Sequence, residues 1–188
     1  MMGNRQGGFS LLELLVALFV VVLVTSLVTL NIGSGDRDIL LRAAVEGVAD
    51  SANYALDEAQ FSGINYGLAV RMEDDQGQWR YRCDWYVEGP TGWRAPDSGT
   101  EGFAATMLPP GIEVQLELEG ATQDREALLA NSTNPQPQLV LYASGETVPG
   151  AIIVREATTD ELLWRLEWDL LGNFKALRNG DLIGEEDL

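Results

Sequence analysis

The pattern of apolar and polar residues changes twice along the 188-residue chain. Residues 9–32 are apolar almost without interruption, residues 38–63 carry apolar side chains at every third or fourth position, and much of residues 64–188 alternates between apolar and polar. These patterns predict an apolar helix, an amphipathic helix and a series of short β-strands, in that order. The chain is therefore expected to be an α+β protein.

The apolar segment is long enough for a membrane-spanning helix. A helix over residues 9–32 would extend about 36 Å, against a hydrocarbon thickness of about 30 Å. Its one charged residue is Glu13, while Arg5 precedes it and Asp36 begins the polar sequence that follows. Arg5 predicts a cytoplasmic amino-terminal side.

The amphipathic segment has a face of small apolar residues suited to close packing. Gly33-Ser34-Gly35 separates it from the apolar segment and predicts a kink or a locally unwound link, because glycine is a poor helix former. Gly63 is the expected stop of the helix. The apolar face consists of Leu41, Ala44, Val48, Ala52, Ala55 and Ala59.

The alternating segments predict an antiparallel two-layer β-domain, with the helix from residue 36 covering one apolar face. A short helix is expected at Arg125–Ala130, and Gly172-Asn173 marks a hairpin turn. Three strand faces are expected to point inward: Tyr81, Cys83, Trp85 and Val87; Ile112, Val114, Leu116 and Leu118; and Leu162, Trp164, Leu166 and Trp168.

Composition excludes several functions. The net charge is −17, all of it within residues 36–188, which argues against nucleic acid and against anionic lipid headgroups as partners. The chain has no histidine and a single cysteine, Cys83, so histidine-based catalysis, most zinc sites and an intrachain disulfide are excluded. Glu73-Asp74-Asp75 and Asp97 are candidate calcium ligands, but we interpret them as solvated turns. No cofactor, metal or catalytic residue is expected.

The junction "GGFSLLE", residues 7–13, resembles the class III signal of type IV pilins and type II secretion pseudopilins. The resemblance implies that a prepilin peptidase cuts between Gly8 and Phe9 and methylates Phe9, so that Glu13 becomes the fifth mature residue. The alternative is a plain signal anchor, which does not explain the glycines and the glutamate at this spacing.

The position of Glu13 has a physical explanation under this resemblance. Cleavage creates an ammonium group on Phe9, and Glu13 lies on the same helix face, roughly 6 Å along the axis. A carboxylate within the membrane costs a few kcal/mol, and the ammonium group of a neighbouring subunit can neutralise it. Glu13 is thus expected to set the stagger between packed helices, whereas the simpler interpretation is a side chain that reaches the nearby interface.

Later stretches resemble the GspH-type minor pseudopilins of type II secretion: "NYGLAV", "QLVLYASGETVPGAIIV" and "LLGNFKAL". The resemblance implies a type IV pilin-like fold with a leader at 1–8, a transmembrane and assembly helix at 9–35 and a periplasmic domain at 36–188, divided into a helix at 36–62 and a β-domain at 64–188.

The implied function is assembly near the tip of a periplasmic pseudopilus anchored in the bacterial inner membrane. Other minor pseudopilins, the major pseudopilin and prepilin peptidase are the implied partners. Two alternatives remain: a FimT-like minor pilin of type IV pili, and a membrane-anchored periplasmic enzyme. The absence of histidine and of a nucleophile motif weighs against the enzyme.

The first prediction concerns processing. Cleavage between Gly8 and Phe9 should leave Phe9, methylated, as the mature amino terminus, because glycine leaves a protease cleft unobstructed. A bulky residue in place of Gly8 should leave the precursor inserted but uncut. Intact-mass analysis distinguishes these forms, and a mature chain that starts at Met1 or beyond residue 26 would contradict the prediction.

Overall fold

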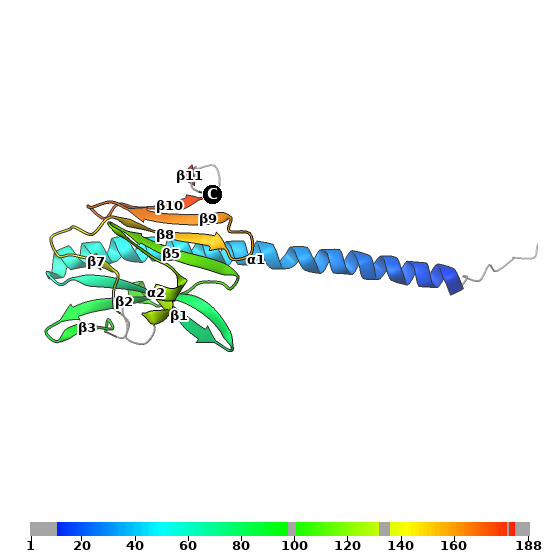
Figure 1. Ribbon diagram of the computed structural model, residues 1–188, viewed down its shortest axis with the longest axis horizontal. Coiled ribbons are helices and arrows are strands. Elements are labelled where there is room, and N and C mark those ends of the chain that lie inside the picture. Colours follow the sequence, from blue (N-terminus) through cyan, green and yellow to red (C-terminus); the bar gives the residue numbers. More distant parts are fainter. Residues whose placement is uncertain (1–10, 98–100, 132–135, 180, 183–188) are drawn as a thin grey trace, which may run out of the picture. The chain divides into compact units, whose positions relative to one another are not determined.

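The structure is a computed structural model that describes residues 11–97, 101–131, 136–179 and 181–182, without the side chains of 24–34, 101 and 181–182. Its first element is the 52-residue helix α1 (Leu11–Ser62), which is followed by a β-rich region (Figure 1). The chain divides into two compact units, residues 1–39 and residues 40–188. The strands and the second part of α1 all belong to the second unit.

Helix α1 is continuous through Gly33-Ser34-Gly35, so the expected unwound link is wrong. Two isolated glycines lower helix propensity by about 1 kcal/mol each, which a long helix tolerates. The helix ends as expected: Gly63 takes a left-handed φ of +72° and donates its N–H to the Ala59 carbonyl at 2.9 Å. Among the described residues, no helix is both long and apolar enough to cross a membrane.

Two antiparallel sheets form the β-rich region, as the alternating patterns predicted. Sheet A has the order β3-β2-β1-β7, with β4 also paired to β2; sheet B has the order β11-β10-β9-β8-β5-β6. The strands of sheet A are β1 (Tyr66–Asp75), β2 (Gln78–Gly89), β3 (Gly92–Arg94), β4 (Thr106–Met107) and β7 (Leu139–Leu141). Those of sheet B are β5 (Ile112–Leu118), β6 (Ala121–Gln123), β8 (Gly150–Glu156), β9 (Leu162–Trp168), β10 (Phe174–Arg178) and β11 (Asp181–Leu182).

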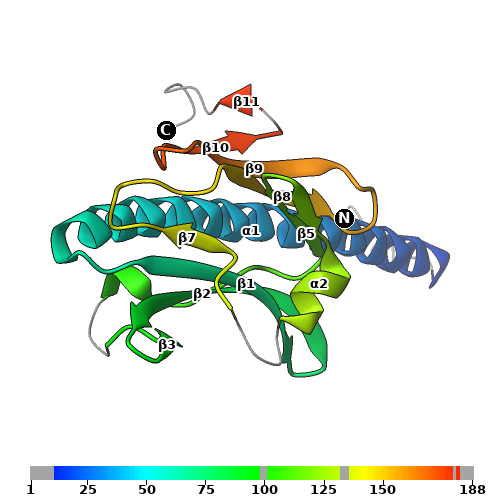
Figure 2. The same ribbon diagram turned by 60° about the vertical axis from the view of Figure 1, so that its left-hand side comes forward.

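The core lies between the second part of α1 and both sheets. Residues 40–62 of α1 run with sheet A on one side and strands β8–β10 of sheet B on the other (Figures 1 and 2). Ala44 and Val48 of α1 line one small apolar cavity together with Cys83 of sheet A and Ile152 of sheet B. The helix therefore does more than cover one face, because it fills the space that the two sheets enclose. Its buried residues are Leu41, Val45, Val48, Ala52, Ala55, Leu56 and Ala59.

The predicted inward faces of the strands are confirmed with small differences at the strand ends. All four members of the β2 face are buried, as are three members on β5 and three on β9. Leu118 and Leu162, at the ends of their strands, are only partly buried. The buried set is Tyr81, Cys83, Trp85, Val87, Ile112, Val114, Leu116, Trp164, Leu166 and Trp168.

Two smaller predictions are also confirmed. Helix α2 spans Arg125–Ala130, and the Asp124 side chain caps it by accepting from the N–H groups of Glu126 and Ala127. The β9–β10 hairpin turns at Gly172, whose φ is +68°. A Cβ at Gly172 would lie 2.6 Å from Cδ2 of Leu56, so the turn packs directly on α1. The remaining element is a short 3₁₀ helix at Glu101–Phe103.

Burial of Cys83 generates a prediction about its reactivity. The side chain is 2% exposed, and burial raises the pKa of its thiol to about 12, with the nearby Asp84 carboxylate adding to the shift. Thiol reagents attack the thiolate, so labelling of the native full chain at pH 8 should be roughly a hundredfold slower than labelling in denaturant. Mass spectrometry follows the reaction, and rapid labelling of the native protein would place this face of β2 outward.

Candidate functional site

The amino-terminal part of α1 presents large apolar side chains in every direction. Residues 11–23 all lie exposed in the single chain. Exposed fractions run from 47% for Leu23 to 80% for Leu11. A helix that is apolar on all sides requires an apolar environment or partner helices. The large apolar residues are Leu11, Leu12, Leu14, Leu15, Val16, Leu18, Phe19, Val20, Val21, Val22 and Leu23.

Glu13 stands in the first turn of this helix and is exposed. A carboxylate in that position interacts favourably with the positive end of the helix dipole, by roughly 0.3–1 kcal/mol. Gly8 and Phe9 lie outside the described residues. The cleavage site, the methylated residue and the spacing between Phe9 and Glu13 therefore remain predictions from the sequence.

The acidic residues considered as calcium ligands have other partners. Within the described residues, no group of acidic, cysteine or histidine side chains gathers as metal ligands would. Each carboxylate instead has a local partner, and Glu73, Asp74 and Asp75 lie in the last residues of β1 rather than in a turn. Glu73 pairs with Arg82 at 2.7 Å, Asp75 with Arg80 at 2.6 Å and Asp97 with Arg94 at 2.9 Å, while Asp74 accepts the Gly77 N–H at 2.7 Å.

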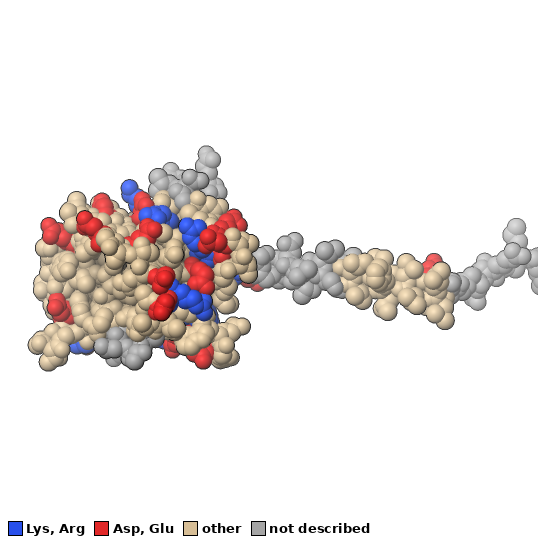
Figure 3. All heavy atoms as spheres, viewed as in Figure 1, with Lys and Arg blue, Asp and Glu red and all other residues tan. Residues whose placement is uncertain are grey.

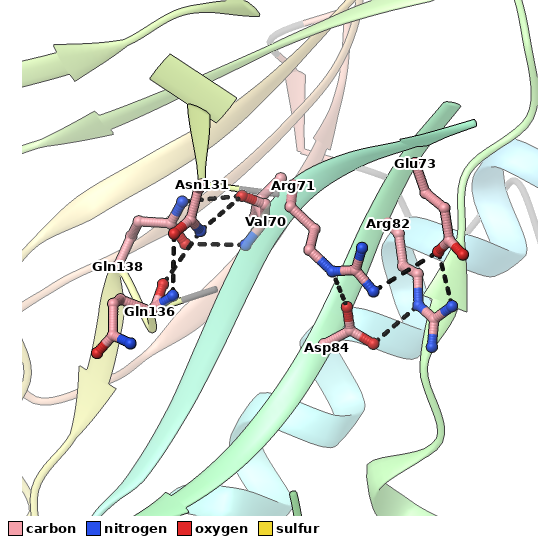
Figure 4. A network of polar contacts seen from close by, with 8 residues as sticks. All are labelled: Val70, Arg71, Glu73, Arg82, Asp84, Asn131, Gln136 and Gln138. Atoms are coloured by element: carbon pink, nitrogen blue, oxygen red, sulfur yellow. Dashed lines mark hydrogen bonds and ion pairs between the residues drawn. The ribbon is translucent and has the colours of Figure 1, made fainter. Parts of the chain in front are cut away.

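A charged network on the outer face of sheet A was not anticipated from the sequence. Arg71 of β1 and Arg82 of β2 lie directly opposite each other, an arrangement that repels. Asp84 lies between them, accepting from Arg71 Nε at 2.7 Å and from Arg82 Nε at 2.8 Å, and Glu73 also pairs with both (Figure 4). The Asp84 side chain is only 12% exposed, so its charge is poorly screened and the network holds β1 to β2.

Amide side chains continue the pairing of β1 beyond β7. The Gln138 side chain accepts from the Val70 N–H at 2.9 Å and donates to the Val70 carbonyl at 2.8 Å, as a neighbouring strand would (Figure 4). Asn131 donates to the same carbonyl and exchanges hydrogen bonds with the Gln136 backbone. These side chains satisfy backbone groups, a structural task rather than a chemical one.

A third polar contact joins the two sheets to α2. The Tyr81 hydroxyl of β2 donates to Oε2 of Glu113 on β5 at 2.5 Å, and Arg125 of α2 pairs with the other oxygen at 2.7 Å. Burial raises the pKa of Tyr81 to about 12, and the hydrogen bond to Glu113 adds to the shift. The phenol therefore remains protonated and keeps donating throughout the physiological pH range.

The described polar clusters hold strands together, whereas residues 11–23 of α1 expose their large apolar side chains. Alternation along β2 already placed Arg82 and Asp84 opposite its inward face, but the strand register that brings them to Arg71 and Glu73 was not readable from the sequence. The candidate functional site is therefore the exposed apolar helix with Glu13 in its first turn.

Comparisons with known proteins give separate matches for the amino-terminal segment and for the fold. Residues 3–29 match the model of the prokaryotic N-terminal methylation motif. In structure, the chain is similar to the minor pseudopilin EpsH from the Type 2 Secretion System of Vibrio cholerae, with a TM-score of 0.58 and 23% identity, covering 77% of this chain and 99% of that one. It is also similar to Escherichia coli GspH, with a TM-score of 0.52 and 19% identity over 78% and 94% of the two chains.

The methylation motif and the α+β fold together place the chain in the class of pilin-like proteins. The sequence relatives are more specific. Type II secretion system protein H of Pseudomonas aeruginosa is 30% identical over 152 residues, 76% of this chain and 78% of that protein. Its counterpart in Aeromonas hydrophila is 24% identical over 186 residues, 94% and 96% of the two chains. The chain belongs to the type II secretion system protein H family.

The charged network on sheet A leads to a prediction about stability. Asp84→Asn should lower the free energy of unfolding by about 1–3 kcal/mol, because two opposed arginines lose the carboxylate between them. All five tryptophans lie in residues 79–168, so their fluorescence during denaturation of the full chain in detergent reports on the β-rich unit.

The matched control is Asp97→Asn, which also removes a carboxylate that forms an ion pair with an arginine, here Arg94. The Asp97 side chain is 88% exposed, so this change should cost no more than about 0.5 kcal/mol. Equal effects of the two substitutions would show that the sheet A network contributes no more than a surface pair.

Proposed function

We propose that the chain is made as a membrane-inserted precursor, cut between Gly8 and Phe9, methylated on Phe9 and assembled as a minor pseudopilin near the tip of a periplasmic pseudopilus. The observation that carries this proposal is the match of residues 3–29 to the methylation motif, which includes the start of α1, where large apolar side chains of residues 11–23 are exposed. Family membership supports the role in type II secretion. The work of the protein is assembly and contact, not catalysis.

The anchor in this proposal is residues 9–35, and the periplasmic part is residues 36–188. Between Glu13 and Asp36 the sequence has no charged residue. The charge excess follows this segment, and a domain of net charge −17 is suited to an aqueous compartment rather than to an anionic lipid surface. The positive-inside rule applied to Arg5 supports an inner-membrane orientation with the β-rich domain in the periplasm.

In this proposal Glu13 sets the axial stagger between one helix and its neighbours. It is the single charged side chain on an otherwise apolar surface, which makes an unpaired carboxylate costly once the helix is surrounded by lipid or by other helices. The new ammonium group of a neighbouring mature chain is a partner of opposite charge at the same depth. Pairing fixes the axial offset because displacement by one turn separates the charges by about 5.4 Å.

Two other functions have less support. A FimT-like minor pilin would share the processing motif, but both of the relatives described above are named for type II secretion. An anchored enzyme would need nucleophiles and bases, whereas the buried Cys83 and Tyr81 have raised pKa values that keep them protonated. A type II secretion operon around the gene would favour the secretion role over the pilus role.

The Glu13 proposal predicts a separation of processing from assembly. Glu13→Gln should be cut normally between Gly8 and Phe9, because the junction is unchanged, yet should recover roughly three- to tenfold less of the other pseudopilins on co-purification. Apolar helix packing remains, so assembly weakens without being abolished. Intact mass reports processing, and quantitative blotting of membrane extracts reports recovery.

Glu161→Gln is the matched control, since it makes the same chemical change on an exposed residue of the β-rich domain. It should leave both measurements unchanged. If Glu13→Gln assembles as well as the control, Glu13 has no pairing role and serves only as a side chain that reaches the interface.

A further inference from the structure

Sheet B carries an open groove of about 520 Å³ on its outer face, beside the β9–β10 turn. The groove is bordered by the ends of β5 and β9, by Pro149 and Gly150 at the start of β8, and by Lys175 of β10. Figure 3 shows acidic and basic side chains interspersed over the face of the domain where β5, β8 and β9 lie. The network on sheet A and the contact between Tyr81 and Glu113 do not involve this groove.

Carboxylates outnumber cations along the groove by four to two: Glu117, Glu119, Glu167 and Asp169 against Arg165 and Lys175. Arg165 is already shared between Glu117 and Glu167, at 3.2 Å from each. Asp169 accepts hydrogen bonds from Asn173 that lower the pKa of its carboxyl, so it stays ionised at neutral pH. Glu119 is exposed at the end of β5, and the groove therefore attracts cations.

Exposed apolar side chains flank the groove on the same end of the sheet. Leu170 is 53% exposed, Leu171 is 64% exposed and Val148 is 37% exposed. Their backbones are fixed: Thr147 donates its N–H to the Leu170 carbonyl at 2.9 Å, and Trp168 Nε1 donates to the Val148 carbonyl at 2.7 Å. Because Gly172 packs on Leu56 of α1, the turn presents its leucines from a rigid base.

We propose that this groove and turn form a docking surface for a different pilin-like subunit of the same assembly. That subunit inserts a lysine or arginine side chain among the groove carboxylates and packs apolar side chains on Leu171. Charge complementarity selects this occupant. A second copy of this chain carries the same net charge of −17, so it is repelled.

This inference rests on the proposed function, because it assigns one contact of the proposed pseudopilus. It is tested in the native bacterium with the full-length tagged chain, extracted in mild detergent with the other pseudopilins. Glu119→Lys reverses a charge in the groove, and its side chain makes none of the hydrogen bonds or ion pairs described above. We expect roughly fivefold lower recovery of the partner, with normal processing and normal protein level.

Matched controls separate a local contact from a general effect of charge or hydrophobicity. Glu161→Lys makes the same charge change at the β8–β9 turn, at the opposite end of the sheet. Leu129→Ser on α2, where the side chain is 40% exposed, is the control for Leu171→Ser. The two groove-side substitutions should lower partner recovery and the two controls should not; equal recovery across all four would overturn the proposal.

A photo-reactive amino acid in place of Leu171 identifies the occupant directly. Cross-linking to another pseudopilin, lost when Glu119→Lys is added, supports the docking surface. Cross-linking to a second copy of this chain, or to none of the pseudopilins that co-purify, overturns it while leaving the proposed function intact. If the wild-type chain recovers no pseudopilin at all, the proposed function fails as well, and the two failures are thus distinguishable.

Discussion

The fold depends on how closely two sheets approach one helix. Ala52, Ala55 and Ala59 of α1 are completely buried, and their short side chains allow the strands to pack near the helix backbone. Interiors are packed as densely as organic crystals, so a larger side chain at these positions would push both sheets outward. The same approach brings Leu56 against Gly172 and Ala44 into a shared cavity with residues of both sheets.

Because both sheets pack around α1, polar side chains from different strands and sheets come within contact distance. Tyr81 and Glu113 come from different sheets, and they meet only because both sheets converge on α1. The arginines and carboxylates of β1 and β2 remain on the opposite, outer face of sheet A, where cross-strand register determines their partners. The β-rich unit is thus held together by polar contacts around an apolar core, and the network on sheet A and the contact between Tyr81 and Glu113 do not use the groove on the outer face of sheet B.

The amino-terminal part of α1 differs from the β-rich unit because its apolar side chains are exposed rather than packed in a core. The large apolar side chains of residues 11–23 are exposed, and the lone carboxylate among them stands near the positive end of the helix dipole. Such a helix is completed only by lipid or by other helices. Membership of the protein H family fits the proposed arrangement, in which residues 9–35 would be the anchor and the β-rich domain would make the specific contacts.

The sequence by itself determined the elements, because side-chain periodicity is a local property. It predicted the end of α1 at Gly63, helix α2, the inward face of β2 and the hairpin at Gly172, and its terminal motif indicated the class of protein. It was wrong about an unwound link at Gly33-Ser34-Gly35, where the helical hydrogen bonds continue despite low propensity. Only the tertiary structure decided that α1 contacts both sheets, that Asp84 lies between two opposed arginines, and that Glu119 and Asp169 border one groove. Each of these depends on strand register and sheet approach, which bring together residues that are far apart in the sequence.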